Sequence, residues 1–200
     1  MENITPLCEI AYKYGTDKCP QIKHVYTPYY YKLFNERKRI VKKVLEMGIG
    51  NYKDMKHVDT CYDPALKRTY HRGASLHMWR EFFPNALIYG ADVLPDTMFT
   101  DERITTYLCD ETKDNELREL IRKVGSDTDL FVDDGLHTKE AQIYMAQTVM
   151  PLLDKDVTYI IEDVGFPDHI KLALSNYNVE CPHLPERKYQ KGRLMVIKHK

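Results

Sequence analysis

The fold is decided by the stretch Leu45-Glu46-Met47-Gly48-Ile49-Gly50, in which an apolar run meets an acid and two spaced glycines. Two later stretches are built alike: Val132-Asp133-Asp134-Gly135-Leu136-His137 and Ile160-Ile161-Glu162-Asp163-Val164. In each, carboxylates stand at or just beyond the end of a short β-branched, apolar run. The carboxyl ends of neighbouring parallel strands meet at one edge of an open sheet, where ligands bind. The three stretches therefore predict one acidic ligand site at that edge, and with it an enzyme.

Short apolar runs alternate with helical patterns along most of the chain. Strands are expected at 41–47, 86–91, 103–108, 129–132 and 157–161, with a closing pair at 177–181 and 193–198. Helices are expected at 75–83, capped by Ser75, at 114–124 and at 139–153. Most strand runs are apolar on both faces, as in sheets covered by helices on both sides. We expect an α/β fold with a doubly wound, mainly parallel, seven-stranded sheet and an antiparallel C-terminal hairpin.

Composition excludes several classes of partner. The chain carries 29 Lys and Arg against 30 Asp and Glu, so it has no polybasic field for nucleic acid. No apolar run approaches the ~20 residues of a membrane span, and the first residues lack the pattern of a signal peptide. The five cysteines are scattered without a C-x-x-C pair, which indicates reduced thiols in the cytoplasm and no zinc site.

Acids at three successive strand ends predict a nucleoside ligand. Glu46 can accept bonds from an ammonium or hydroxyl group, while Gly48 and Gly50 let the backbone approach the ligand closely. Asp92 ends the next expected strand, where a carboxylate can bind both ribose hydroxyls. The pair Asp110-Glu111 follows the strand after that and is placed for the amino edge of an adenine.

The glycine pattern disfavours a dinucleotide. A dinucleotide site expects G-x-G-x-x-G with its ribose acid about 20 residues further on. Here Lys53 stands where the third glycine of that pattern would be, and the candidate ribose acid Asp92 lies much further along the chain than 20 residues. An S-adenosyl ligand has no phosphates and carries a sulfonium and an amino-acid tail. S-adenosylmethionine therefore suits an acidic edge better than NAD.

A divalent metal is the second expected ligand. Asp134 follows the fourth expected strand, and Glu162 and Asp163 follow the fifth. Three oxygen donors without a soft ligand suit Mg²⁺, Mn²⁺ or Ca²⁺. Such a cation could bind neighbouring sugar or catechol hydroxyls and make one of them more acidic. His137, three residues after Asp134, is the expected general base, which makes Asp134 and His137 the catalytic pair.

Two alternatives to an enzyme that uses S-adenosylmethionine follow from the same residues. An iron-dependent hydroxylase would need two histidines and a carboxylate, and only His137 is suitably placed in the sequence. The other seven histidines have no comparable context. A non-catalytic S-adenosylmethionine-binding protein is the second alternative, against which the complete set of His137 and acidic ligands argues.

Motifs in a fixed order extend this interpretation over nearly the whole chain. They are Tyr14-Gly15-Thr16-Asp17-Lys18, His24-x-Tyr26-Thr27-Pro28-Tyr29-Tyr30, Leu45-Glu46-x-Gly48-x-Gly50, Gly73-Ala74-Ser75-Leu76-x-Met78-Trp79, Phe83-Pro84-Asn85-Ala86, Asp133-Asp134-Gly135-x-His137 and Ile161-Glu162-Asp163. Together they resemble class I S-adenosylmethionine-dependent methyltransferases, in particular the metal-dependent sugar O-methyltransferases of macrolide biosynthesis and the related cephalosporin hydroxylase-like proteins. Leu136 departs from the pattern, since a serine is common there, and this bears on substrate fit.

The resemblance implies a single methyltransferase domain over 1–200. Its Rossmann-like core would span 37–200, and the tyrosine-rich helical segment 1–36 would cover the cofactor. The resemblance also implies a set of cofactor-binding residues: Tyr14, Thr16, Lys18, Glu46, Gly48, Gly50, Ser75, Asp92, Asp110 and Asp133. The metal ligands would be Asp134, Glu162 and Asp163.

The expected activity is O-methylation of a sugar hydroxyl. The expected acceptor is a small molecule or glycan that carries a deoxysugar such as rhamnose. The alternative within this chemistry is a catechol-type small-molecule O-methyltransferase. No nucleic acid or membrane partner is expected, and a homo-oligomer is left open.

Overall fold

The computed structural model describes residues 4–50, 60–63, 68–185 and 193–200. Its strands are β1 (Lys43–Met47), β2 (Thr60–Asp63), β3 (Arg68–His71), β4 (Leu87–Asp92), β5 (Thr100–Asp101), β6 (Ile104–Leu108), β7 (Leu130–Asp133), β8 (Thr158–Ile161), β9 (Asn178–Glu180) and β10 (Met195–Lys198). Its helices are α1 (Pro6–Tyr14), α2 (Tyr26–Phe34), α3 (Ala74–Phe82), α4 (Asp114–Val124), α5 (Lys139–Val149) and α6 (Pro167–Ala173). Short 3₁₀ turns occur at Pro95–Thr97 and Met150–Leu152.

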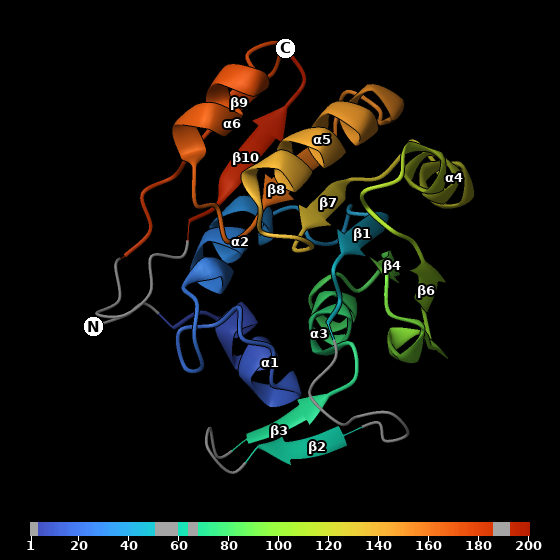
Figure 1. Ribbon diagram of the computed structural model, residues 1–200. Coiled ribbons are helices and arrows are strands. Elements are labelled where there is room, and N and C mark those ends of the chain that lie inside the picture. Colours follow the sequence, from blue (N-terminus) through green and yellow to red (C-terminus); the bar gives the residue numbers. More distant parts are fainter. Residues whose placement is uncertain (1–3, 51–59, 64–67, 186–192) are drawn as a thin grey trace.

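The described strands form one large sheet and one separate hairpin. The sheet has the order β5-β6-β4-β1-β7-β8-β10-β9, and β2 pairs only with β3. Strands β6, β4, β1, β7 and β8 run parallel, whereas β10 and β9 continue the sheet antiparallel. Helices α1 to α3 lie on one face of the sheet and α4 to α6 on the other (Figure 1). The predicted mainly parallel α/β fold with its antiparallel C-terminal hairpin is confirmed, but the described part of the sheet has eight strands and not the seven expected, because β5 adds to its edge.

The register of the parallel strands brings their carboxyl ends level. Met47 of β1 lies opposite both Ala91 of β4 and Asp133 of β7, and Asp133 lies opposite Ile161 of β8. The residues that follow these strands therefore lie in one row along the edge of the sheet. This row is the acidic edge that the sequence predicts.

Several element boundaries differ from the expectations. Helix α3 begins at Ala74 after Gly73, which has a left-handed backbone (φ 59°), so Ser75 lies in the first turn and is not the cap. Helix α5 ends at Val149 because Pro151 lacks the N–H that would continue it, and a 3₁₀ turn follows. The edge strand β5, the hairpin β2–β3 and helix α6 are additions to the predicted set. The sequence also predicts a loop over 182–192 between the two closing strands, and residues 186–192 of it lie outside the described part of the chain.

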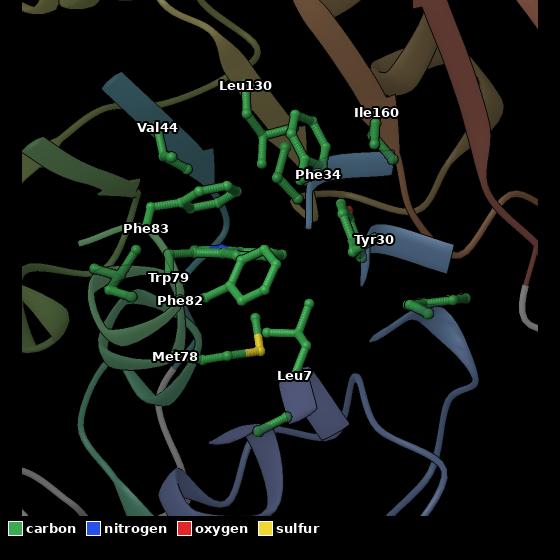
Figure 2. Packing of buried hydrophobic residues seen from close by; sticks show 14 of the residues in the cluster. Leu7, Tyr30, Phe34, Val44, Met78, Trp79, Phe82, Phe83, Leu130 and Ile160 are labelled. Atoms are coloured by element: carbon green, nitrogen blue, oxygen red, sulfur yellow. The ribbon is translucent and has the colours of Figure 1, made fainter. Parts of the chain in front are cut away.

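The helical lead-in is anchored to the sheet by an aromatic core. Figure 2 shows Tyr30 and Phe34 of α2 packed against Trp79 and Phe83, beneath the strand residue Val44. The ring centroids of Tyr30 and Trp79 are 4.9 Å apart, and those of Phe34 and Phe83 are 5.6 Å apart, both edge to face. Such pairs add about 0.5–1.5 kcal/mol each beyond the burial of their area. Helix α2 is thereby fixed beside the strand ends.

A second core occupies the opposite face of the sheet. It packs α4 and α5 against the strands through residues such as Leu117, Leu120, Met145 and Phe131. Among the described residues, no helix combines the length and the apolar character that crossing a bilayer requires.

Candidate active site

A cavity of about 450 Å³ opens at the carboxyl ends of the parallel strands. It is lined by most of the residues that the sequence singles out: Thr16, Lys18, Glu46, Gly48, Gly50, Ser75, Asp92, Asp134, His137, Glu162 and Asp163. The N-terminal segment thus lies against the strand ends. This follows because the parallel strands end at the same level and α2 is packed beside them.

The turn after β1 passes so close to β7 that only glycine fits. Gly48 has φ 82°, and a Cβ there would lie 2.1 Å from the backbone oxygen of Asp134. The same turn is held by Asp92, whose Oδ2 accepts hydrogen bonds from the backbone N–H groups of Ile49 (3.1 Å) and Gly50 (3.0 Å). Asp92 is therefore a fixed, buried acid that faces the cavity.

Lys18 is the buried counter-ion of three carboxylates. Its Nζ lies 2.6 Å from Asp134 Oδ2, 2.5 Å from Glu162 Oε2 and 3.3 Å from Glu46 Oε1. Burial works to lower the pKa of Lys18, but attraction to Asp134, Glu162 and Glu46 outweighs it and raises that pKa well above the usual value. Burial likewise raises the pKa of Asp134 to about 6, against the attraction of Lys18. The lysine therefore stays charged and offsets the repulsion between these three carboxylates.

Lys18→Met should strongly destabilise the metal-free protein, because it removes the cation and leaves the buried Glu46 and Glu162 and the partly buried Asp134 without their counter-ion. Breaking a buried ion pair by removing one partner costs roughly 3–5 kcal/mol. Urea unfolding in EDTA would measure the loss of unfolding free energy. The matched control is Lys13→Met. Lys13 pairs with Glu81 at the surface, where the Lys13 side chain is 58% exposed and the Glu81 side chain is 36% exposed. That control should lose less than about 1 kcal/mol. Equal losses in the two variants would contradict the assignment of Lys18 as a necessary counter-ion.

A second cluster contains Asp134, His137 and Asp163, whose ligand atoms all lie within 4.8 Å of one another. Asp163 has a left-handed backbone (φ 51°), which is uncommon outside glycine and clusters at functional sites. Its Oδ1 accepts a hydrogen bond from the Tyr26 hydroxyl at 2.5 Å, and His137 Nε2 lies 3.7 Å from its Oδ2. Two carboxylates and an imidazole form a donor set that suits a divalent cation.

Glu162 lies outside that cluster, although the sequence groups it with Asp134 and Asp163. Its Oε1 accepts from the Tyr30 hydroxyl at 2.6 Å, and its Oε2 accepts from Lys18. Because neighbouring residues at a strand end point in different directions, Glu162 faces the buried lysine while Asp163 faces His137. The structure thus separates the predicted metal ligands into two groups.

Three predicted cofactor residues do not line the cavity. Tyr14 donates from its hydroxyl to Glu81. Asp110 accepts from the backbone and hydroxyl of Thr112. Asp133 is buried and accepts from the Tyr159 hydroxyl at 3.1 Å.

Of the pair Asp110-Glu111 that the sequence places at this strand end, Glu111 lines the cavity. Its Oε1 accepts from the backbone N–H of Leu136 at 2.7 Å. Burial raises the pKa of Glu111. The adjacent pair Asp110-Glu111 is visible in the sequence, but which of the two faces the cavity depends on the turn before α4.

Sequence reasoning also missed three residues from the segment between α1 and α2, namely Asp17, Lys23 and His24, which line the cavity. The histidine contradicts the expectation that only His137 has a relevant context. Burial lowers the pKa of His24, although Asp163 and Asp17 oppose the effect. The motifs that contain Asp17 and His24 are the feature of the sequence from which their place at the cavity could have been predicted.

The sequence comparisons give a consistent set of relatives. No protein-family model matches the chain. The chain is 32% identical over 158 residues to demethylmacrocin O-methyltransferase of Streptomyces fradiae, covering 79% of this chain and 36% of that protein. It is 28% identical over 162 residues to 8-demethyl-8-alpha-L-rhamnosyl tetracenomycin-C 2'-O-methyltransferase of Streptomyces olivaceus, covering 81% and 38%. The chain thus spans little more than a third of the length of these curated relatives.

Solved structures show the same fold. The MycE methyltransferase from the mycinamycin biosynthetic pathway, in complex with Mg and SAH, matches with a TM-score of 0.74 and 23% identity. The match covers 98% of this chain and 55% of that one. A SAM-dependent methyltransferase from Anabaena variabilis matches with a TM-score of 0.55 and 14% identity, covering 86% of this chain and 83% of that one.

These findings agree with the motifs quoted above. Over about four fifths of its length the chain is similar to part of demethylmacrocin O-methyltransferase and of a rhamnosyl tetracenomycin-C 2'-O-methyltransferase, and its fold is that of the solved methyltransferases.

Proposed function

We propose that this chain is an S-adenosylmethionine-dependent, divalent-metal-dependent O-methyltransferase that acts on a sugar hydroxyl. The observation that carries the proposal is that one cavity is lined both by Asp92 and Gly48 and by the cluster of Asp134, His137 and Asp163. Relatives named as O-methyltransferases of a rhamnosyl tetracenomycin-C and of demethylmacrocin support it. The expected acceptor is a small molecule or glycan with a deoxysugar such as rhamnose.

The cavity fits the cofactor at Glu46. The Trp79 indole N–H donates to Glu46 Oε2 at 2.5 Å. Glu46 Oε1 is buried and makes no hydrogen bond among the described residues, with Lys18 Nζ 3.3 Å away. This oxygen could accept a bond from the ammonium group of the cofactor's amino-acid tail, while Asp92 could accept from the ribose hydroxyls. Thr16 and Ser75 line the same cavity and would contact this tail.

The donor set of Asp134 and Asp163 fits Mg²⁺, Mn²⁺ or Ca²⁺. S-adenosylmethionine would supply an electrophilic methyl group, and the cation would make a bound hydroxyl more acidic. His137 lies beside Asp163 with its ring in the cavity, and it would accept the hydroxyl proton as the oxygen attacks. The remaining lining residues would hold the hydroxyl oxygen in line with the methyl group. This positioning would be the main contribution of the protein to the rate.

Asp92→Ala should weaken S-adenosylhomocysteine binding by roughly 10- to 100-fold, since it removes charge-assisted hydrogen bonds to the ligand. Calorimetry would measure the affinity, and NAD should not bind. Asp96→Ala is the matched control, because Asp96 is exposed and does not line the cavity. Asp92 also holds the turn at Gly50, so Asp92→Ala could weaken binding by disturbing that turn. A thermal unfolding scan and the isosteric variant Asp92→Asn would separate this effect from the loss of hydrogen bonds to the ligand. Unchanged affinity, or tight NAD binding, would contradict the cofactor assignment.

The function itself is tested by incubating the protein with S-adenosylmethionine, Mg²⁺ and either methyl glycosides or catechols. Mass spectrometry should show one added methyl group on a glycoside such as methyl α-L-rhamnopyranoside. Transfer to catechols alone would favour the catechol-type alternative. Binding of S-adenosylhomocysteine without transfer to either class would favour a non-catalytic binder. The single-domain organisation and the cytoplasmic location stay predictions.

A further inference from the structure

His24 is a buried histidine whose two ring nitrogens, Nδ1 and Nε2, have no hydrogen-bond partner in the described part of the chain. It is 7% exposed and lines the cavity. Its ring stacks on Tyr26 with centroids 4.6 Å apart and planes 7° apart, so the ring cannot turn freely. Buried polar groups are nearly always hydrogen-bonded, so this ring calls for a partner from the cavity.

The neighbouring carboxylates do not fill that role. Nδ1 lies 3.6 Å from Asp163 Oδ1, and Nε2 lies 3.6 Å from Asp17 Oδ2, both beyond hydrogen-bond length. Asp163 is instead oriented by the Tyr26 hydroxyl at 2.5 Å, and Asp17 pairs with Lys23 at 3.0 Å. The carboxylates are held by other groups, and His24 is left for a ligand.

The position of His24 identifies which ligand it faces. The candidate nucleoside acid Asp92 ends β4, whereas Asp163 follows β8, and the strands run in the order β4-β1-β7-β8. His24 therefore lies at the end of the cavity away from Asp92. His24 and His137 lie beside different oxygens of the same Asp163 carboxylate. An acceptor that presents one hydroxyl to His137 would bring its neighbouring groups towards His24.

We propose that His24, with Asp17 beside it, binds a hydroxyl of the sugar acceptor next to the one that is methylated. An imidazole and a carboxylate together offer both a donor and acceptors, as a neutral polyhydroxylated ligand requires. This inference rests on the proposed methyl transfer to a sugar, and it adds a residue that recognises the acceptor. His24 is a binding residue in this assignment, and His137 remains the base.

The test compares His24→Phe, which keeps the stacked ring and removes both nitrogens, with His24→Gln, which restores a donor. With methyl α-L-rhamnopyranoside as acceptor, His24→Phe should raise KM by about tenfold while kcat changes by less than about threefold. His24→Gln should recover part of the loss. The matched control is His169→Phe on α6, because His169 is exposed and outside the cavity. Its KM should equal that of the wild type.

Two further measurements separate the outcomes. S-adenosylhomocysteine affinity and Mn²⁺ affinity should be unchanged in His24→Phe, and the protein should stay folded in a thermal scan. An unchanged KM would overturn the inference while leaving the proposed function intact. Weakened Mn²⁺ binding would overturn it too, since His24 would then support Asp163 and not the acceptor. A wild-type protein that methylates no glycoside would remove both the function and the inference.

Discussion

His137→Ala is expected to slow methyl transfer by about 10²–10⁴, the range typical of general acid–base catalysis. The side chain is 45% exposed and its nearest charged partner, Asp163 Oδ2, is 3.7 Å away. Removing the ring therefore leaves no buried hole and should cost little stability. The rate would be measured at saturating cofactor with a glycoside that the wild type methylates, beside a thermal unfolding scan.

Metal affinity decides between the two roles that the geometry allows His137. The ring nitrogen belongs to the cluster of possible ligand atoms with Asp134 and Asp163. If His137 is the base, Mn²⁺ should bind His137→Ala about as tightly as the wild type. A parallel loss of metal affinity and rate would make it a ligand instead. The control His169→Ala should retain the full rate, and a fully active His137→Ala would contradict both roles.

The arrangement of strand ends could be predicted because its causes are local. An apolar, β-branched run followed by glycine or an acid marks both the strand and the point where it ends. Parallel order then places Asp92, Asp134 and Asp163 along one edge without any knowledge of side-chain packing. The hydrophobic face and the terminal Gly125 likewise defined α4, whose observed bounds equal the expected ones.

What could not be predicted depends on the direction of side chains that meet from distant parts of the chain. The sequence shows Lys18 in a motif, but its insertion between Glu46, Asp134 and Glu162 follows from how α2 packs on the sheet. His24 reaches the cavity for the same reason. The sequence analysis places Asp133 as a cofactor-binding residue and Asp134 as a metal ligand at the same edge, although alternate residues at a strand end point to opposite faces of the sheet. Asp133 consequently meets Tyr159 and not the cavity.

EDTA is expected to abolish methyl transfer, and added Mg²⁺ is expected to restore it. The reason is the site chemistry: Asp134 and Asp163 offer hard oxygen donors beside His137, and an acceptor hydroxyl needs a cation to become acidic enough to react near neutral pH. Mass spectrometry of the methylated glycoside would follow the loss and the recovery. Cofactor binding in EDTA, measured with S-adenosylhomocysteine, shows whether the loss lies in the chemistry. Full activity in EDTA would remove the metal from the mechanism.

Two amide variants then show which carboxylates hold the cation. The sequence groups Glu162 with Asp163, whereas the structure gives both oxygens of Glu162 to Tyr30 and Lys18 and leaves Asp163 Oδ2 facing His137. Asp163→Asn should therefore weaken Mn²⁺ binding by roughly 10- to 100-fold, and Glu162→Gln should weaken it less. Asp168→Asn on α6 is the control, because that carboxylate is exposed and outside the cavity. Equal losses of Mn²⁺ affinity in Glu162→Gln and Asp163→Asn would mean that the cation displaces Lys18 and binds Glu162. The three ligands predicted from the sequence would then be correct. A loss at neither position would place the cation elsewhere.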